Sequence, residues 1–320
     1  MKVVALAGGV GAGKFLRGLI RVVPPEDVTV IVNTGDDIVM HGLHVSPDLD
    51  SVTYWLGGVA DRDRGWGRAG ETFRATEELR ALGAAGSWFG LGDLDLATHL
   101  YRTEMLAEGR SLSEATSVLA ARFGVKAHLL PMTDDPVATH VEVSGVTGAA
   151  LDLHFQEYWV RRGGRDEVKA VRFEGIERAR PAPGVVEAIE SGDAVLFCPS
   201  NPIVSVDPIL AVPRIGEAVA ARRGRAAGVS PIVGGSPLRG MADKLLPVVG
   251  VEVSAAGVAS YYAGRGLIGS WVIDGADREL AGRVRALGIG VTVTDTIMVD
   301  DEAAERLART ALAIALGDQQ

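Results

Sequence analysis

The first fifteen residues carry the feature that most restricts the fold. An apolar run from Val3 to Ala7 predicts a buried strand, and it is followed at once by four glycines and a lysine: Gly8, Gly9, Gly11, Gly13 and Lys14. A strand that turns through glycines into a helix is typical of α/β proteins that bind phosphate. Backbone N–H groups approach the anion there, and the helix N-terminus attracts it. We therefore expect an anion site after the first strand, with the helix itself over Phe15 to Val23.

The spacing from Gly8 to Lys14 also satisfies the P-loop pattern G-x-x-x-x-G-K, but the residue that follows the pattern differs. Phe15 stands where such a loop needs Ser or Thr to hold Mg²⁺, so a P-loop kinase is disfavoured. On the residues alone, two interpretations remain open. One is a phosphate site of another kind, and the other is a tight strand-to-helix turn without a ligand.

Composition excludes several classes of function. The net charge of -9 argues against generic binding to nucleic acid or anionic membranes. A single cysteine, Cys198, leaves no internal disulfide and no cysteine-rich metal site. No apolar stretch reaches the length of a bilayer span, and no signal peptide is expected. We therefore expect a cytoplasmic protein with no nucleic-acid and no membrane partner.

The order of strand and helix patterns predicts an α/β fold, a Rossmann-like doubly wound mostly parallel sheet with a helical insertion. Val28 to Val32 is the second strand, and later apolar runs alternate with amphipathic segments. Residues 61–125 show helical periodicity, with a capping box beginning at Ser111. We expect one domain over 1–320, with 61–125 inserted in it and the strands of 127–171 continuing the sheet.

Four aspartates follow the second strand within fifteen residues: Asp36, Asp37, Asp48 and Asp50. Such a group can hold Mg²⁺ through carboxylate oxygens, and one member can act as a general base on a hydroxyl. The alternative is that Asp48 and Asp50 cap a helix beginning near Ser51. Because these two are only two residues apart, they cannot share a helical face, which favours different roles for them.

Three further loops carry candidate ligand contacts. Ser200 and Asn201 lie between prolines after the strand 194–198, where they would contact a base or ribose or simply form a turn. The loop 234–240 would hold another anion or serve as a plain connection. Trp66, flanked by glycines, would stack on a planar ring or anchor packing between parts of the fold.

Taken in order, eight motifs resemble those of the 2-phospho-L-lactate transferase / phosphoenolpyruvate transferase family of coenzyme F-420 biosynthesis. They are Ala7–Lys14, Asn33–Asp37, Ser46–Asp50, Trp66–Gly67, Leu91–Asp93 with Ala97–His99, Pro131–Val137, Pro199–Pro202 and Val229–Ile232. The resemblance extends from Val4 to about Met298. It implies that 1–320 is a single α/β transferase domain.

The resemblance also implies a reaction. A phosphorylated three-carbon acid, phosphoenolpyruvyl or 2-phospho-L-lactyl, would move from its guanosine diphosphate ester to the ribityl hydroxyl of 7,8-didemethyl-8-hydroxy-5-deazariboflavin. GMP would leave, Mg²⁺ would be required, and the protein would be a homodimer. The abundance of Ala, Gly, Arg and Val suits a GC-rich actinobacterial genome, for which we expect the enolpyruvyl donor.

Roles for individual residues follow from the resemblance. The diphosphate would bind the glycine turn, at Gly8, Gly9, Gly11 and Lys14. The catalytic pair would be Asp48 and Asp50, acting as metal ligand and base in an order left open. Asp36 and Asp37 would join Asp48 at the metal, while Ser200 and Asn201 would contact guanosine and Trp66 the deazaflavin. The alternative is a non-catalytic nucleotide-sensing regulator resembling gluconeogenesis factors, which share the glycine-rich opening.

Overall fold

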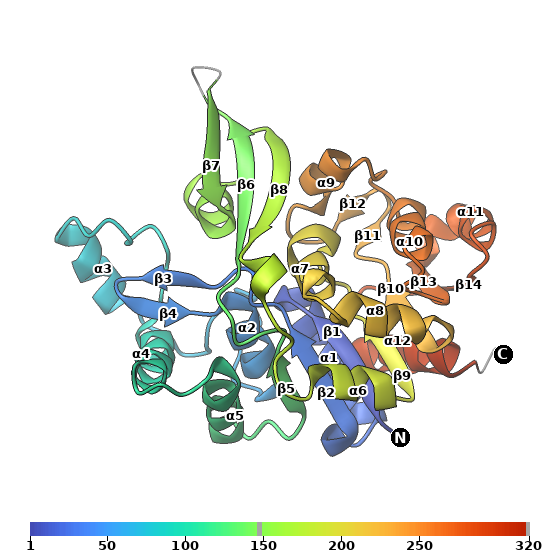
Figure 1. Cartoon of the computed structure of the whole chain (residues 1–320), viewed down its shortest axis with the longest axis horizontal. Coiled ribbons are helices and arrows are strands. Elements are labelled where there is room, and N and C mark those ends of the chain that lie inside the picture. Colours follow the sequence, from blue (N-terminus) through green and yellow to red (C-terminus); the bar gives the residue numbers. More distant parts are fainter. Residues whose placement is uncertain (146–148, 318–320) are drawn as a thin grey trace.

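The computed structural model describes residues 1–145 and 149–317, and its centre is a seven-stranded parallel sheet (Figure 1). The strand order is β14-β13-β10-β9-β1-β2-β5, and every neighbouring pair is parallel. The strands are β1 (Val3–Ala7), β2 (Val28–Val32), β5 (His128–Pro131), β9 (Ala194–Phe197), β10 (Ala226–Val229), β13 (Ser270–Asp274) and β14 (Gly290–Thr294). The predicted Rossmann-like, doubly wound sheet is confirmed.

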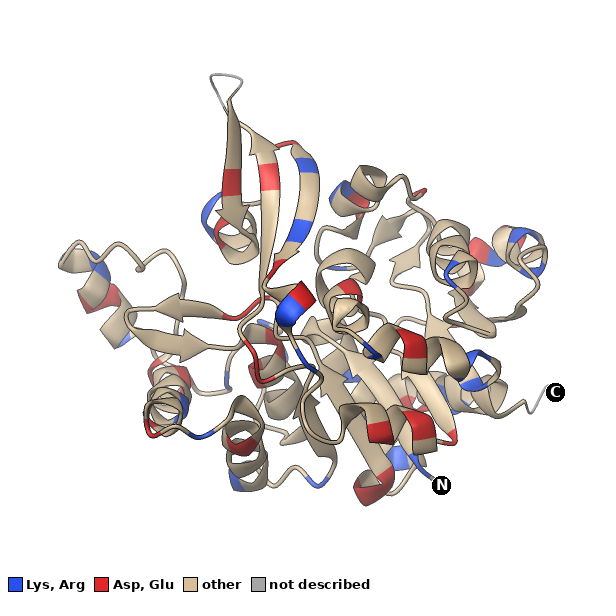
Figure 2. Cartoon of the chain, in the orientation of Figure 1, with Lys and Arg blue, Asp and Glu red and all other residues tan. Residues whose placement is uncertain are grey.

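The inner strands β1, β2, β9 and β10 are buried on both faces, which explains their composition. β1, β2, β9 and β10 contain no charged residue, whereas charged residues occur on the surrounding helices (Figure 2). Successive residues of β1 alternate between two cores, with Val3 and Ala5 in one and Val4 and Leu6 in the other. Near-continuous apolar runs are therefore required, because both faces of each strand pack against helices.

Helices cover both faces of the sheet. One core includes side chains of α1 (Gly9–Val22), α2 (Pro47–Leu56), α5 (Leu112–Arg122) and α12 (Asp301–Leu316). The other includes side chains of α6 (Val185–Ser191), α7 (Asp207–Ala211), α8 (Ile215–Ala221), α9 (Ala242–Leu245), α10 (Ala255–Gly264) and α11 (Ala281–Arg285). Among the residues described, no helix combines the length and apolarity needed to cross a bilayer.

Helix α1 begins at Gly9, so the expected start at Phe15 was wrong. Three of the glycines predicted as a loop, Gly9, Gly11 and Gly13, lie in the first turns of the helix, and Gly8 is its N-cap residue. Close packing explains them, because a Cβ on Gly11 would stand 2.5 Å from the carbonyl oxygen of Pro199. A Cβ on Gly13 would stand 2.6 Å from the Trp55 ring. Glycine lowers the helix propensity of this segment, but it allows Pro199 and Trp55 to approach the helix closely.

The strands of the middle region do not continue the central sheet, so that expectation was also wrong. β6 (Ala138–Ser144), β7 (Ala150–His154) and β8 (Val168–Glu174) form a separate antiparallel sheet in the order β7-β6-β8. It projects away from the core in Figure 1. The reason is visible in β6, whose residues alternate between buried and more exposed positions, as in a sheet with one covered face.

Residues 61–125 contain α3 (Arg74–Ala81), α4 (Asp93–Ala107) and α5. The predicted capping box is confirmed: Ser111 Oγ accepts a hydrogen bond of 3.1 Å from Glu114 N, and the Glu114 carboxylate accepts one of 2.8 Å from Ser111 N. Two short hairpins complete the fold, β3 (Ile38–Met40) with β4 (Leu43–Val45) and β11 (Ile232–Val233) with β12 (Ser236–Pro237).

Candidate active site

A cavity of about 1030 Å³ opens at the carboxyl ends of the central strands. The chain runs from β1 to β2 and β5 on one side and then returns to place β9 on the other side of β1. The loops after β1 and β9 therefore diverge, and ligands of open α/β sheets bind at such a point. All but one of the predicted site residues line the cavity: Gly8, Gly9, Gly11, Lys14, Asp36, Asp48, Asp50, Trp66, Ser200 and Asn201.

The turn after β1 is held by Ser200. Its Oγ accepts a hydrogen bond of 3.1 Å from Gly8 N and donates one of 2.9 Å to Gly8 O. A Cβ on Gly8 would stand 2.4 Å from Asp48 Oδ2, and Gly9 has φ +72°, a conformation that favours glycine. The glycines thus admit the Asp48 carboxylate as well as preparing the turn for an anion.

Asn201 also has an internal contact. Its side-chain oxygen accepts a hydrogen bond of 2.9 Å from Ile203 N and so caps the short π-helical turn Pro202–Val206. The oxygens of Ser200 and Asn201 therefore shape the two loops, and their contact with guanosine remains a prediction.

Asp48 lies in the first turn of α2, which begins at Pro47 rather than near Ser51, and the N-cap residue of this helix is Ser46. Its Oδ2 accepts a hydrogen bond of 2.9 Å from Asn33 Nδ2. Burial raises the pKa of Asp48 to about 7, although the Asn33 hydrogen bond lowers it in part. Asp48 can therefore both hold and release a proton near neutral pH.

Asp36 is the second carboxylate of the cavity. Burial, followed by the negative charges of Asp48 and Asp37, raises its pKa well above the ordinary value. Its Oδ2 accepts a hydrogen bond of 3.3 Å from Gln156 Nε2, while its buried Oδ1 has no hydrogen-bond partner among the described residues. Two buried carboxylates with raised pKa values, one of them with an oxygen that has no partner among the described residues, fit a divalent cation with oxygen ligands.

Asp37 is the predicted residue that the structure does not bring into the cavity lining. Its Oδ2 accepts a hydrogen bond of 2.7 Å from Ser46 Oγ and lies 2.9 Å from His44 Nε2. These contacts hold the segment leading into α2. A metal-binding role for Asp37 remains a prediction, and the geometry favours Asp36 and Asp48 for it.

Asp50 is paired with a buried arginine. Arg102 on α4 donates two hydrogen bonds to its carboxylate, Nη2 to Oδ1 and Nη1 to Oδ2, the second of 3.1 Å. Both side chains are nearly inaccessible to solvent. Asp48 and Asp50 thus have different partners, in line with their spacing, and Asp50 is already neutralised by a cation.

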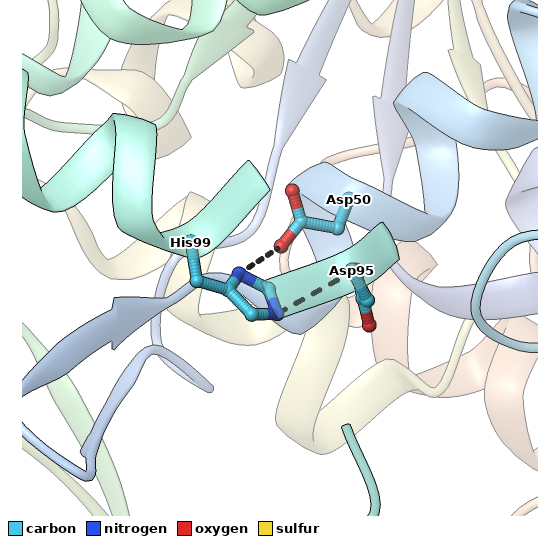
Figure 3. A group of neighbouring side chains, drawn as sticks. All are labelled: Asp50, Asp95 and His99. Carbon is cyan, nitrogen blue, oxygen red and sulfur yellow. Dashed lines mark ion pairs between the residues drawn. The ribbon is translucent and has the colours of Figure 1, made fainter. Parts of the chain in front are cut away.

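His99 lies between Asp50 and a further aspartate, Asp95 (Figure 3). Its Nδ1 is 3.5 Å from Asp50 Oδ2, and its Nε2 is 3.5 Å from Asp95 Oδ1. Tyr54 donates a hydrogen bond of 2.6 Å to the same Asp95 oxygen. Burial opposes ionisation of Asp95, but His99 lowers its pKa below the ordinary value. The guanidinium of Arg102 already supplies positive charge here, which disfavours a metal ion between Asp50, Asp95 and His99.

Sequence reasoning missed several residues of this cavity and its surroundings. His99 entered only through the resemblance, and Asp95 and Arg102 did not enter at all. A signal existed, because positions 95, 99 and 102 lie on one face of a helix and would put three ionisable groups on it. Gln156 and Trp159 line the cavity from the segment after β7, where no local pattern marks them.

Trp66 lines the cavity with an exposed fraction of 43%. One neighbour is Phe73, whose ring meets it edge-on at 6.1 Å, and another is Arg64, whose guanidinium carbon lies 4.9 Å from the ring centre. A large, partly exposed ring in a cavity wall can stack on a planar ligand.

Comparison with known proteins shows the family to which the chain belongs. The model for "2-phospho-L-lactate transferase CofD" matches residues 3–314. The phosphoenolpyruvate transferases of Kitasatospora aureofaciens and Streptomyces coelicolor are each 51% identical to the chain. Each match covers 98% of this chain and 98% of the relative. That of Mycolicibacterium smegmatis is 42% identical over 98% of this chain and 99% of the relative.

A solved structure shares the fold. A UPF0052-family protein of Bacillus halodurans superposes with a TM-score of 0.60 at 18% identity, covering 97% of this chain and 99% of that one. The similarity in sequence is too low to carry more than the fold. The family match and the curated relatives, by contrast, span almost the whole chain, and the chain belongs to the 2-phospho-L-lactate transferase family.

Proposed function

We propose that the protein transfers a phosphoenolpyruvyl group from its guanosine diphosphate ester to the ribityl hydroxyl of 7,8-didemethyl-8-hydroxy-5-deazariboflavin in coenzyme F-420 biosynthesis. The 2-phospho-L-lactyl group is the alternative cargo. Family membership supports the reaction class. The names of the relatives and the composition of the chain favour the enolpyruvyl donor.

The observation that carries this proposal is the arrangement of one cavity. The glycine turn with Lys14 offers N–H groups and positive charge, the buried carboxylates Asp36 and Asp48 accept protons or a cation, and Trp66 offers an aromatic surface. Attack of an alcohol on a phosphoanhydride requires charge neutralisation, a positioned hydroxyl and a proton acceptor. These requirements are met within a single space.

In the proposed step the ribityl oxygen bonds to the phosphorus that carries the three-carbon acid. The bond from that phosphorus to the bridging anhydride oxygen breaks, and GMP leaves. The hydroxyl proton passes to the Asp48 carboxylate, which lies beside the glycine turn. Lys14 and the first N–H groups of α1 bind the diphosphate.

Asp36 and Asp48 would hold Mg²⁺, which when bound supplies positive charge to the phosphate oxygens. Asp50 acts through its neighbours. Its ion pair with Arg102 fixes α2 against α4, and with it the direction in which Asp48 points. We therefore assign Asp50 as a positioning residue and Asp48 as the residue that touches the reacting atoms.

The test is to incubate the purified protein with deazaflavin, Mg²⁺ and each synthesised donor, and to measure the mass of the product. Enolpyruvylated product is expected, and product from the lactyl donor alone would overturn the choice of cargo. The regulator alternative predicts binding of guanine nucleotide with no change in deazaflavin fluorescence. Asp48→Asn is the matched variant, expected to bind nucleotide without forming product.

A further inference from the structure

The hairpin 232–237 and the residues after it line the cavity without a role in the proposed step. Gly234 and Gly235 form its turn, both with positive φ. Gly234 N donates hydrogen bonds of 3.2 and 3.1 Å to the two carboxylate oxygens of Asp277. The turn is therefore occupied by the protein's own carboxylate and does not cradle a ligand anion. Arg239, which follows the hairpin in the sequence, contributes a positively charged side chain to the cavity lining.

Arg239 crosses to the loop that carries Trp66. Its Nη1 donates a hydrogen bond of 3.2 Å to Arg64 O. A Cβ on Gly65 would stand 1.9 Å from the same nitrogen, and Gly65 has φ +81°. The positive φ favours glycine at this position, and two loops distant in sequence lie together with the Arg239 guanidinium beside Gly65, the residue before Trp66. A guanidinium has five N–H donors, and one is used by this contact.

Arg239 also has uncompensated charge. Its neighbours are paired, Arg64 with Asp61 at 2.9 Å and Arg62 with Asp301 at 3.1 Å. Neither Arg239 nor Lys14 forms an ion pair within the part of the chain that the structure describes. Burial and then the positive charge of Arg239 lower the pKa of Lys14. Two cations that line the cavity are thus without an ion-pair partner among the described residues.

We infer that Arg239 binds the carboxylate of the three-carbon acid carried by the donor. This inference rests on the proposed function. The donor has two phosphates and one carboxylate, and the glycine turn with Lys14 accounts for the phosphates alone. The carboxylate lies beyond the transferred phosphate, where the acceptor also approaches. Arg239 acts electrostatically on Lys14 and contacts the residue before Trp66, and guanidinium matches a carboxylate with two parallel hydrogen bonds.

The experiment compares two donors in the wild type and Arg239→Gln. One donor carries the enolpyruvyl acid, and the other is the guanosine diphosphate vinyl ester, which lacks only the carboxylate. We expect Arg239→Gln to lower kcat/KM for the acid donor about 10- to 100-fold, as for loss of a hydrogen bond to a charged group, and to leave the vinyl ester unchanged. Equal losses with both donors would mean that Arg239 binds phosphate or only supports the fold, and would overturn the inference.

Arg62→Gln is the matched control. Its positive charge also lowers the pKa of Lys14, but it is paired with Asp301 and does not line the cavity, so both donors should react as with the wild type. Dissociation constants of the two donors, measured by calorimetry without acceptor, give a second readout. Wild type that binds the acid donor but forms no product contradicts the proposed function. An Arg239→Gln variant that binds the two donors in the wild-type ratio contradicts the inference alone.

Discussion

Replacing Asp48 by asparagine should stabilise the metal-free protein while abolishing transfer. The folded pKa of about 7 exceeds the ordinary value of 3.8 by about 3 pH units. At 1.36 kcal/mol per unit, this corresponds to about 4 kcal/mol of lost stability for the wild type at about pH 8. Asn33 can still donate its hydrogen bond to the new amide oxygen. The new amide N–H₂ needs partners, which reduces the expected gain to about 1–3 kcal/mol.

The pH dependence gives the sign of the effect. Between about pH 4 and pH 7 the folded protein retains the Asp48 proton while the unfolded chain has released it, so the stability of the wild type falls as the pH rises through this window. Below about pH 4 both states are protonated, and the advantage of Asp48→Asn should disappear.

Urea unfolding in a chelating buffer, at several pH values from about 4 to 8, measures this difference. Added Mg²⁺ should stabilise the wild type and not the variant, because ligands that bind only the folded state shift its unfolding. Asp50→Asn is the contrasting variant, expected to lose stability since it leaves Arg102 buried without its partner. An Asp48→Asn protein no more stable than the wild type at about pH 8, or with a gain that does not depend on pH, would refute the reasoning.

Three further outcomes follow from the site. Arg102→Leu should lower the free energy of unfolding by about 3–5 kcal/mol, measured by urea denaturation, because Asp50 would remain buried without a cation. Gly8→Ala should reduce transfer at least tenfold in the product assay, since its Cβ would meet the Asp48 carboxylate, and wild-type rates would argue against this contact. Trp66→Ala should raise KM for deazaflavin and leave the GDP dissociation constant unchanged; equal effects on both would contradict stacking on the acceptor.

Much of the central sheet was predictable from local sequence, because its inner strands are near-continuous apolar runs. Val3–Ala7, Val28–Val32 and Gly290–Thr294 have the predicted bounds. The start of α1 was not predictable, because the reason for its glycines is the approach of Pro199 and Trp55 from distant parts of the chain. Local propensity indicates a loop there, and tertiary packing makes it a helix.

In the candidate site too, some residues were predictable from local sequence and others were not. Asp36 and Asp48 were found because they follow a strand at the sheet edge where the glycine turn also lies. Arg102 and Asp95 were missed because they lie on α4, and only the tertiary fold brings that helix against α2. Arg239 lies in the loop 234–240, which was predicted from the sequence as a possible anion site. In the structure the backbone of the turn binds Asp277, and the Arg239 side chain is the group available to an anion.

The release of GMP tests most directly whether the phosphoenolpyruvyl group passes straight to an acceptor alcohol. The purified protein is mixed with the enolpyruvyl donor and Mg²⁺, with and without deazaflavin, and GMP and product are measured over time. We expect negligible GMP without deazaflavin, and one GMP per molecule of enolpyruvylated deazaflavin with it. GMP formed at the same rate without acceptor, or bound donor that yields no product, would contradict direct transfer.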